Sequence, residues 1–322
     1  METVLEVENL YVEYRTEEEL VRAVNGISFE VLKGENLGLV GETGAGKTTT
    51  ALTIMGLLPP EVSVVRQGRV LFKHVDLITQ SESYLRSVRG NGIGMVFSDP
   101  MTSLNPVLTV GEQIAEVLHL HYQEMSSEDV EDRVNEILSL VGIPPQRKNE
   151  YPHQFSGGMR QRVVIAMAIV CNPELLIADE PTTALDVTIQ AQILDMIEEL
   201  RRKMSMSMIL ISHDLGVIAE TCEKVAVMYA GEIVEYGSVE HIYESDVHHP
   251  YTSGLFGSIP DITKETRRLN PIPGMMPDPT NLPSGCKFHP RCPECIEICR
   301  KVAPETVDID GHQINCHLFA EV

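Results

Sequence analysis

A glycine-rich string near the N-terminus, GETGAGKT at residues 41–48, contains residue types that point to chemistry. It fits the pattern of Gly, four residues and Gly-Lys-Thr that forms phosphate-binding loops. Glycines let successive backbone N–H groups converge on phosphate oxygens, Lys47 adds a full positive charge, and the Thr48 hydroxyl can bind Mg²⁺. A glycine-rich turn without a ligand is the alternative. Nucleotide binding is predicted for Gly41, Thr43, Gly44, Ala45, Gly46, Lys47, Thr48 and Thr49.

A second string, LLIADE at residues 175–180, is typical of a buried strand that ends in two carboxylates. A phosphate-binding hydrolase has a metal-facing acid and a base at such a point. Asp179 is therefore predicted to reach Mg²⁺, directly or through water, and Glu180 to polarise the attacking water. The alternative is an acidic strand end that simply enters a loop, and the presence of the GETGAGKT loop argues against it.

Alternating strands and helices must position these two strings. From Val4 to Val40, short β-branched runs broken by Gly, Asn and acidic residues predict small strands. The last run, residues 36–40, leads through the glycine-rich loop into a helical stretch at 48–58. Downstream, the spacing of apolar residues predicts a helical insertion at 109–142, with Ser126 as an N-cap and Gly142 as the residue that ends it. Helices are predicted at 159–171 and 189–200, and strands at 175–178 and 208–212. A hairpin at 225–237 follows. This order favours an α/β fold with a covered parallel sheet.

Three further strings resemble the motifs of ABC-transporter ATPases, in the order that this family has them. FSGGMRQR at 155–162 is similar to the signature, PTTALD at 181–186 to the D-loop, and ISHD at 211–214 to the switch histidine. The resemblance runs from about Val4 to Gly237. It implies an ABC-type P-loop core with an N-terminal antiparallel β subdomain and a helical subdomain at about 100–160. It also implies that the chain binds ATP and Mg²⁺ and hydrolyses ATP.

The signature serine and glycines open a helix, so the Ser156 hydroxyl and the amides of Gly157 and Gly158 form a second anion site. The resemblance implies that two nucleotide domains pack head to tail, each signature closing over the γ-phosphate held by the partner's loop. Asp186 then belongs to the D-loop. An ordinary serine cap on a core helix is the alternative.

Two more roles come from the resemblance. His213 is implied to contact the γ-phosphate and the attacking water, where a satisfied structural histidine is the alternative. Tyr14 is implied to stack on adenine, with Tyr11 as the weaker choice and simple strand packing as the alternative.

One position departs from the family pattern, because Ser98 stands where the family has a glutamine that senses Mg²⁺ and touches the membrane subunit. Serine is too short for the same contact, so weakened hydrolysis or coupling is predicted, with a bridging water as a substitute.

The strings SDPMTSLNP at 98–106, HHPYTSGLFGSIP at 248–260 and IPGMMPDPTNLPSGCKFHPRCP at 272–293 resemble the ATP-binding subunits of oligopeptide and dipeptide importers. Nickel importers are close relatives of these. The resemblance now covers almost the whole chain. It implies transmembrane permease subunits and a second, identical or homologous ABC ATPase subunit as partners. An extracytoplasmic peptide-binding protein is implied indirectly, and the location is the cytoplasmic face of the cell membrane.

Five of the seven cysteines fall between Cys286 and Cys316. In the importer subfamily four cysteines recur, and the matching positions here are Cys286, Cys292, Cys299 and Cys316. Cys295 is extra. Four thiolates can hold an iron–sulfur cluster or Zn²⁺, and spacings wider than those of zinc ribbons favour a [4Fe-4S] cluster, with Zn²⁺ as the alternative. Cys171 and Cys222 are interpreted as core thiols. Solvated loop positions, with spare ligands as the alternative, are predicted for His248, His249, His289, His312 and His317.

Composition limits the remaining choices. The chain has 322 residues, 25 Lys plus Arg against 47 Asp plus Glu, and a formal net charge of -22. Such a surface argues against nucleic-acid binding and requires any phosphate site to be local. At roughly 150 residues per domain, two domains are expected. The acidic N-terminus lacks an export-signal pattern and no apolar run reaches the ~20 residues that span a bilayer, so a cytosolic chain is expected.

The leading hypothesis is the ATP-hydrolysing subunit of an ABC importer that drives peptide uptake. Residues 1–237 are predicted to form the nucleotide-binding domain, and residues 238–322 a small C-terminal extension with the four-cysteine metal site. A nickel-importer ATPase is one alternative. A soluble ABC-type ATPase, not coupled to transport, is the other, and a single nucleotide domain with no basic patch argues against it.

Overall fold

The computed structural model describes residues 2–16, 19–183, 185–258 and 271–320. Ala184 of the PTTALD string and the last two residues of HHPYTSGLFGSIP lie outside this part. Contacts divide the chain into two compact units. Unit 1 comprises Met1–Val4, Val31–Asn36 and Thr79–Ile211, and unit 2 comprises Leu5–Glu30, Leu37–Ile78 and Ser212–Val322. The boundary at residue 237 divides the chain by sequence, and it stays a prediction.

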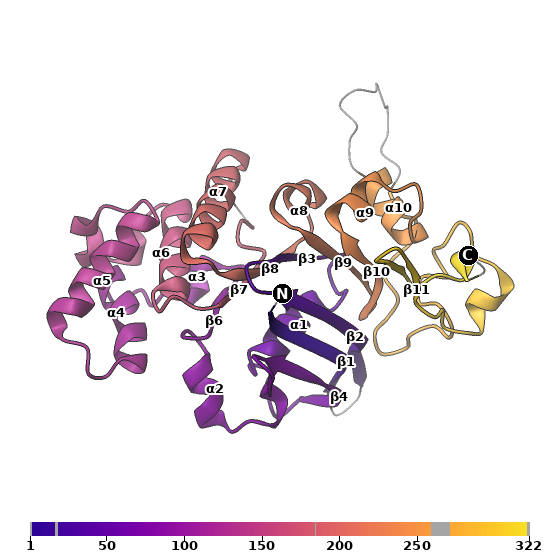
Figure 1. Ribbon diagram of the computed structural model, residues 1–322, viewed down its shortest axis with the longest axis horizontal. Coiled ribbons are helices and arrows are strands. Elements are labelled where there is room, and N and C mark those ends of the chain that lie inside the picture. The colour runs from indigo at the N-terminus through magenta and orange to yellow at the C-terminus, as the bar shows by residue number, and fades with distance from the viewer. Residues whose placement is uncertain (1, 17–18, 184, 259–270, 321–322) are drawn as a thin grey trace. The chain divides into compact units, whose positions relative to one another are not determined.

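Unit 2 contains the predicted N-terminal antiparallel β subdomain (Figure 1). Its four strands run in the order β2-β1-β4-β5, namely β2 (Leu20–Leu32), β1 (Thr3–Arg15), β4 (Ser63–Phe72) and β5 (Val75–Asp76). β1 shows why the sequence forms a half-buried strand, because Leu5, Val7, Leu10 and Val12 are buried while the residues between them are more exposed. The expectation of N-terminal strands is confirmed, but β1 and β2 have 13 residues each and are longer than the small strands that were predicted.

The remaining strands of unit 2 lie in the order β11-β12-β10-β9-β3. Their bounds are β3 (Asn36–Val40), β9 (Lys224–Tyr229), β10 (Glu232–Ser238), β11 (Val307–Ile309) and β12 (His312–Ile314). β3 pairs with β9 in parallel, and β9 and β10 form the predicted hairpin. The small hairpin β11–β12 was not predicted, and it extends this sheet at the C-terminal end. Helices of this unit are α1 (Lys47–Ile54), α8 (Leu215–Thr221), α9 (Val239–Glu244) and α10 (Pro250–Gly257).

The C-terminal segment has an aromatic core of its own. Phe288 is 1% exposed and lies with its ring centroid 5.1 Å from that of Tyr229 and 5.5 Å from that of Tyr251. The rings meet edge to face, which adds to the area that they bury. A loop region poor in regular structure is thus held to β9 and α10 by packed aromatic side chains. Its other elements are single turns, η4 (Glu297–Arg300) and η5 (His317–Phe319).

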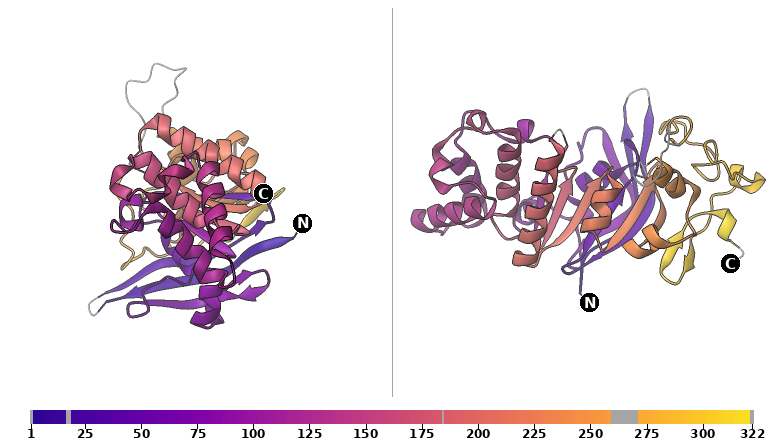
Figure 2. Two further views of the ribbon diagram at one scale, coloured as in Figure 1. Left: turned by 90° about the vertical axis from the view of Figure 1, so that its left-hand side faces the viewer. Right: turned by 90° about the horizontal axis from the view of Figure 1, so that it is seen from above.

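Unit 1 contains three parallel strands, β6 (Ile93–Val96), β7 (Leu175–Asp179) and β8 (Ser207–Ser212). β6 and β7 are buried along their whole length, and β8 except at Ser212, as expected for a sheet covered on both faces. The other helices are α2 (Glu82–Val88), α3 (Pro100–Ser103), α4 (Val110–His121), α5 (Ser127–Leu140), α6 (Gly157–Ile169) and α7 (Val187–Met204), with short turns η1 (Leu77–Thr79), η2 (Pro145–Asn149) and η3 (Pro152–Gln154). Figure 2 shows α4, α5 and α6, in magenta, as packed helices.

Helix starts in unit 1 follow the predicted signals. The Ser126 side chain accepts a hydrogen bond from Asp129 N–H, which confirms it as the N-cap of α5. Thr109 and Glu112 form a capping box at the start of α4. The apolar face of α5 is buried, as its spacing predicted, and Gly142 has a φ of 75° just beyond its end.

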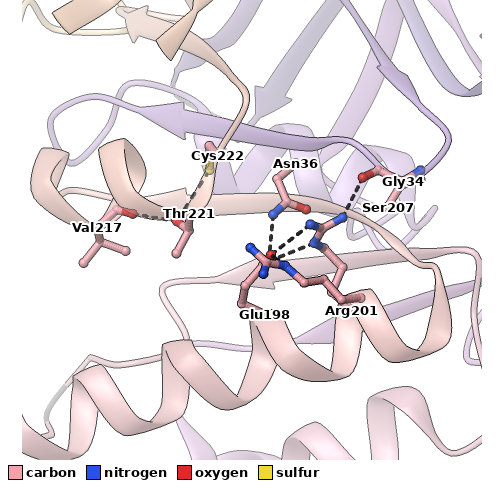
Figure 3. A network of polar contacts seen from close by, with 9 residues as sticks. Gly34, Asn36, Glu198, Arg201, Ser207, Val217, Thr221 and Cys222 are labelled. Carbon is pink, nitrogen blue, oxygen red and sulfur yellow. Dashed lines mark hydrogen bonds and ion pairs between the residues drawn. The ribbon is translucent and has the colours of Figure 1, made fainter. Parts of the chain in front are cut away.

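One polar network fixes the chain before β3 against α7 (Figure 3). The Arg201 guanidinium is 10% exposed, donates to the Gly34 carbonyl at 2.6 Å, and pairs with Glu198 at 2.8 Å. Asn36 donates to the same Glu198 carboxylate at 3.0 Å. Both buried charges therefore have partners, which is the condition for keeping them in a core. The network belongs to the framework of unit 1, at the start of the strand that leads to the glycine-rich loop.

Candidate nucleotide site and cysteine centre

The glycine-rich loop of unit 2 connects the end of β3 to the start of α1, which is the strand–loop–helix arrangement that its pattern requires. A side chain at Gly41 would place its Cβ 2.2 Å from the Met228 carbonyl oxygen, and one at Gly46 would place it 2.6 Å from the Ala23 carbonyl oxygen. Gly46 also has a φ of 103°, in the left-handed region. Both positions therefore need glycine, so the loop is a tightly built structure and not a loose turn.

Lys47 is the first residue of α1 and is 6% exposed. Its Nζ donates to the carbonyls of Gly41, at 2.6 Å, and Glu42, at 3.1 Å. The ammonium is thus held inside the loop by neutral acceptors. A phosphate offers charged oxygens in their place, and charge-assisted hydrogen bonds are stronger than neutral ones. Thr48 follows at the exposed edge of the helix N-terminus.

The two tyrosines of β1 have different surroundings. Tyr14 reaches the loop, since its hydroxyl donates to Thr49 Oγ1 at 3.4 Å. Tyr11 lies over Gly26, where an added Cβ would be 2.6 Å from the Tyr11 hydroxyl oxygen. The structure therefore connects Tyr14 with the phosphate loop and Tyr11 with strand packing, and adenine stacking by Tyr14 stays a prediction.

Sequence reasoning missed a contact made by the acidic residue of the loop. The Glu42 carboxylate accepts two hydrogen bonds from the Arg291 guanidinium, at 2.7 and 3.1 Å, and the Glu42 N–H donates to the Tyr251 hydroxyl at 2.9 Å. Arg291 is 5% exposed and also donates to the Pro273 carbonyl at 2.8 Å. The hydrogen bonds from Arg291 to Glu42 raise the pKa of the guanidinium, which stays charged. The cysteine segment therefore holds the phosphate loop directly.

His213 lies in the turn between β8 and α8 and is exposed. The turn is ordered by its neighbour Asp214, whose carboxylate accepts from Gly216 N–H at 2.9 Å and whose N–H donates to the Ser212 hydroxyl at 3.0 Å. The imidazole is thus presented on a fixed turn at the end of a strand.

In unit 1, β7 ends in the two predicted carboxylates. Asp179 is 4% exposed and is the last residue of the strand. Glu180 has a φ of 46°, a left-handed conformation that is uncommon for a non-glycine residue. Its N–H donates to the Ile211 carbonyl at 2.9 Å, and its carboxylate accepts from the Thr183 hydroxyl at 3.0 Å. A strained backbone with a fixed carboxylate is typical of functional positions.

The signature motif forms the N-terminus of α6. Ser156 is the N-cap, and its hydroxyl accepts from Met159 N–H at 3.4 Å. Ser156 and Gly157 are exposed, whereas Gly158 lies so close to α7 that a Cβ would be 2.7 Å from Ile189 Cγ2. The start of α6 is therefore open to solvent on one side and packed on the other, as an anion site at a helix terminus requires.

Two other motif residues of unit 1 are exposed. Asp186 begins α7 without a side-chain capping bond, and Val187 after it is 81% exposed. Ser98 follows β6, next to Asp99, whose carboxylate caps α3 by accepting from Met101 N–H at 2.8 Å. Asp186 and Ser98 thus lie at a surface where a partner can reach them.

The structure brings the four predicted cysteines together. Burial, with the neighbouring thiols adding to it, raises the pKa of Cys286 to about 12 and that of Cys292 to about 11. Burial also raises the pKa of Cys316, and Cys299 is 6% exposed. Burial disfavours the charged thiolate form of these cysteines, whereas a bound metal centre would favour that form. Cys295 lies next to Cys292, is more exposed than Cys299 and Cys316, and places its thiol 3.6 Å from the Ile296 carbonyl.

Two kinds of metal centre can be held by four thiolates. Tetrahedral Zn²⁺ with bonds of about 2.3 Å holds its four sulfurs about 3.8 Å apart. A four-iron cluster is larger than one ion and needs more widely separated thiolates.

The histidines of this segment correct one prediction. His249 is 1% exposed and His312 is 3% exposed, so neither is a solvated loop histidine. His249 caps α10 by accepting from Tyr251 N–H, and burial lowers its pKa to about 4. Their burial depends on contacts with β10, which residue spacing along the chain cannot show.

Among the helices that the structure describes, none combines the length and apolar character needed to cross a membrane.

Comparisons with known proteins agree with these observations. The family model described as ABC transporter matches residues 24–183. A second family model, described as the C-terminal region of oligopeptide/dipeptide transporters, matches residues 234–299. The two matches cover the phosphate loop with the signature, and the β10-to-cysteine segment, respectively.

Individual relatives are similar over their whole length. The dipeptide transport ATP-binding protein DppD of Bacillus subtilis is 51% identical, with 99% of this chain and 95% of the relative covered. The oligopeptide transport ATP-binding protein AppD of the same organism is 46% identical, with 100% and 98% covered. Among solved structures, the ATP-binding cassette MJ0796, a dimer bound to ADP and Pi, has a TM-score of 0.66 at 27% identity and covers 73% of this chain and 98% of its own. The protein cbiO1 of Clostridium perfringens, part of an ABC transporter complex, has the same TM-score at 26% identity, with 76% and 92% covered.

Proposed function

Because the chain belongs to the ABC-transporter ATPases, in the group of oligopeptide and dipeptide ATP-binding subunits, we propose that it hydrolyses ATP to drive uptake of di- or oligopeptides. The observation that carries this proposal is the phosphate loop itself. Lys47 is buried within it, and Arg291 of the peptide-transporter C-terminal segment holds Glu42 of the same loop. The phosphate loop and the peptide-transporter C-terminal segment are therefore in contact within unit 2.

The proposal assigns ATP binding to the loop residues and Tyr14. The backbone N–H groups from Gly41 to Thr49 and the Lys47 ammonium would hold the phosphates, and Tyr14 would stack on adenine. Thr48 and Asp179 would hold Mg²⁺, which neutralises charge on the phosphate oxygens when it is bound. The exposed hydroxyl at the start of α1 and the nearly buried carboxylate at the end of β7 are ligand types that Mg²⁺ prefers.

The proposal assigns water activation to Glu180 and γ-phosphate contact to His213. The Thr183 hydroxyl orients the Glu180 carboxylate, and the ordered turn around Asp214 presents the imidazole. A positioned carboxylate that takes a proton from water contributes about 10²- to 10⁴-fold to a rate.

We further propose a head-to-tail pair of nucleotide domains, in which Ser156, Gly157 and Gly158 of one subunit close over ATP bound to the other. The exposed start of α6 and the exposed Asp186 and Val187 support this arrangement. A second subunit, identical or homologous, would cover these residues. Transmembrane permease subunits would bind this chain at the cytoplasmic face of the membrane, with a peptide-binding protein on the other side.

Reconstitution tests the transport proposal. The full chain would be co-expressed with its membrane subunits and placed in proteoliposomes with the binding protein. Peptide should raise ATP turnover and accumulate inside. If Ni²⁺ and not peptide stimulates turnover, the nickel importer is the right function. If the chain hydrolyses ATP but binds no membrane subunit, the transport proposal is wrong.

Replacing Ser98 with glutamine is expected to raise Mg-dependent ATP turnover about fivefold. Glutamine restores the longer side chain, and replacing a bridging water by a direct contact gains about 1 kcal/mol. The comparison uses steady-state turnover of the reconstituted transporter, with Ser98→Asn as the control that adds an amide of insufficient reach. Unchanged turnover and transport in Ser98→Gln would contradict the role given to this position.

We propose that Cys286, Cys292, Cys299 and Cys316 hold a [4Fe-4S] cluster, with Zn²⁺ as the alternative. The thiols lie close enough to raise one another's pKa, and their spacings along the chain are wider than those of zinc ribbons. Protein purified without oxygen should contain about four iron and four sulfide per chain. Cys292→Ser should lower the iron content strongly, and the control Cys295→Ser should keep it. A colourless, iron-free protein with zinc in its place would exclude the cluster.

A further inference from the structure

Three side chains from separate parts of unit 2 meet next to β10. Glu235 comes from β10 itself, His248 from the turn before α10, and His312 from β12. His248 Nδ1 and His312 Nε2 lie 2.9 and 2.8 Å from the same oxygen, Glu235 Oε1. All three ligand atoms lie within 4.8 Å of one another.

This cluster is deeply buried. The Glu235 side chain is 0% exposed, that of His312 4% and that of His248 12%. Burial opposes ionisation of Glu235, but the hydrogen bonds from His248 and His312 outweigh it and lower its pKa to about 2. Because solvent does not reach the Glu235 carboxylate, its negative charge is stabilised by hydrogen bonds from the two imidazoles.

The surroundings of the cluster are those of a metal site. The His248 ring has a further hydrogen bond to the backbone of Ser245, and the second Glu235 oxygen accepts from His249 N–H at 2.8 Å. Such outer contacts orient the ligands of metal centres. His241 stacks on His312 with ring centroids 5.5 Å apart, and its buried Nδ1 has no hydrogen-bond partner among the residues that the structure describes.

We propose that Glu235, His248 and His312 form a binding site for a divalent metal ion of the Zn²⁺ type, separate from the cysteine centre. Two imidazoles and one carboxylate are a set that Zn²⁺ binds, whereas Mg²⁺ and Ca²⁺ prefer oxygen alone. Tetrahedral bonds of about 2.1 Å hold ligand atoms about 3.4 Å apart. The two N···O distances would therefore open by about half an ångström.

The site would tie the C-terminal hairpin to β10. Two register pairs, Glu235 with Ile314 and Tyr236 with Gln313, and two hydrogen bonds from Asn315 to β10 carbonyls link β10 to this hairpin in the described sheet. The ligands are separated by 13 and 77 residues along the chain, so a bound ion closes two loops at once. This inference does not depend on the proposed transport function.

Titration of the full, chelator-treated chain with Co²⁺ tests the site. One Co²⁺ per chain should give the visible bands of a tetrahedral nitrogen and oxygen site without a thiolate charge-transfer band, and Zn²⁺ should displace it. Thiolate bands would report binding at the cysteines instead. If only those bands appear, or if no Co²⁺ binds, the cluster is a hydrogen-bonded network and the proposal is overturned.

Substitution separates the ligands from bystanders. His312→Gln and His248→Gln are each expected to weaken Co²⁺ binding at this site at least 100-fold. His119→Gln changes an exposed histidine of α4 and should bind as the wild type does. Zn²⁺ should raise the thermal unfolding midpoint of the wild type and leave that of His312→Gln unchanged. Near-UV circular dichroism shows whether each variant is folded, and a folded His312→Gln with wild-type affinity would overturn the proposal.

Discussion

Replacing Glu180 with glutamine is expected to lower ATP turnover about 10³-fold while leaving ATP binding unchanged. The amide cannot take a proton from water, and the loss of a general base costs about 10²- to 10⁴-fold. Glutamine has the same shape, tolerates the left-handed backbone as well as glutamate does, and can still accept from the Thr183 hydroxyl. The measurement is phosphate release at saturating ATP, beside the dissociation constant of a fluorescent ATP analogue.

Glu199→Gln is the matched control, because it makes the same change at an exposed position of α7. It should keep full turnover. If Glu180→Gln retained more than a third of the wild-type rate, the water-activating role would belong to another group. If it lost ATP binding as well, Glu180 would be a structural residue of β7 and not a base.

Replacing Arg291 with leucine is expected to weaken ATP binding about tenfold. The variant leaves the Glu42 carboxylate without its two hydrogen bonds, within the loop that must hold a triphosphate. An unpaired negative charge repels the phosphates, and tenfold corresponds to about 1.4 kcal/mol. Equilibrium titration with the ATP analogue measures the effect, and Arg86→Leu, at a side chain that is 77% exposed, is the control.

A double variant identifies the cause. Glu42→Gln removes the charge, so Arg291→Leu combined with Glu42→Gln should bind ATP more tightly than Arg291→Leu alone. Recovery of most of the affinity would assign the loss to the unpaired charge. An additive further loss would show instead that Arg291 acts by packing against Tyr229, over which it lies at 5.8 Å from the ring centroid.

Local patterns in the sequence predicted the parts of the molecule that short strings determine. The loop at Gly41 to Thr48 adopts the geometry expected of its pattern, because its glycines are needed for contacts made by neighbouring strands. The helix cap at Ser126 and the buried face of α5 followed from residue spacing for the same reason. The buried parallel strands were predictable because each has the apolar run that its burial requires, whereas the antiparallel pairing of the N-terminal strands was implied by the family resemblance.

Contacts between distant residues were not predictable in this way. Glu42 and Arg291 are separated by 249 positions, and no local pattern indicates that a loop acid has a buried partner. His312 is predicted from the sequence as a solvated loop histidine, whereas pairing of β12 with β10 buries it.

The pairing of Glu42 with Arg291 can form only late in the synthesis of the chain. Ribosomes make the phosphate loop early and the arginine late, so the carboxylate of the loop stays unpaired while the intervening 249 positions are translated. A nascent or prematurely terminated chain therefore contains the nucleotide-binding motif without the group that neutralises its acid. If Arg291→Leu weakens ATP binding as expected, full affinity for ATP would arise only near the end of translation. A truncated product, which could not support transport, would compete poorly for cellular ATP.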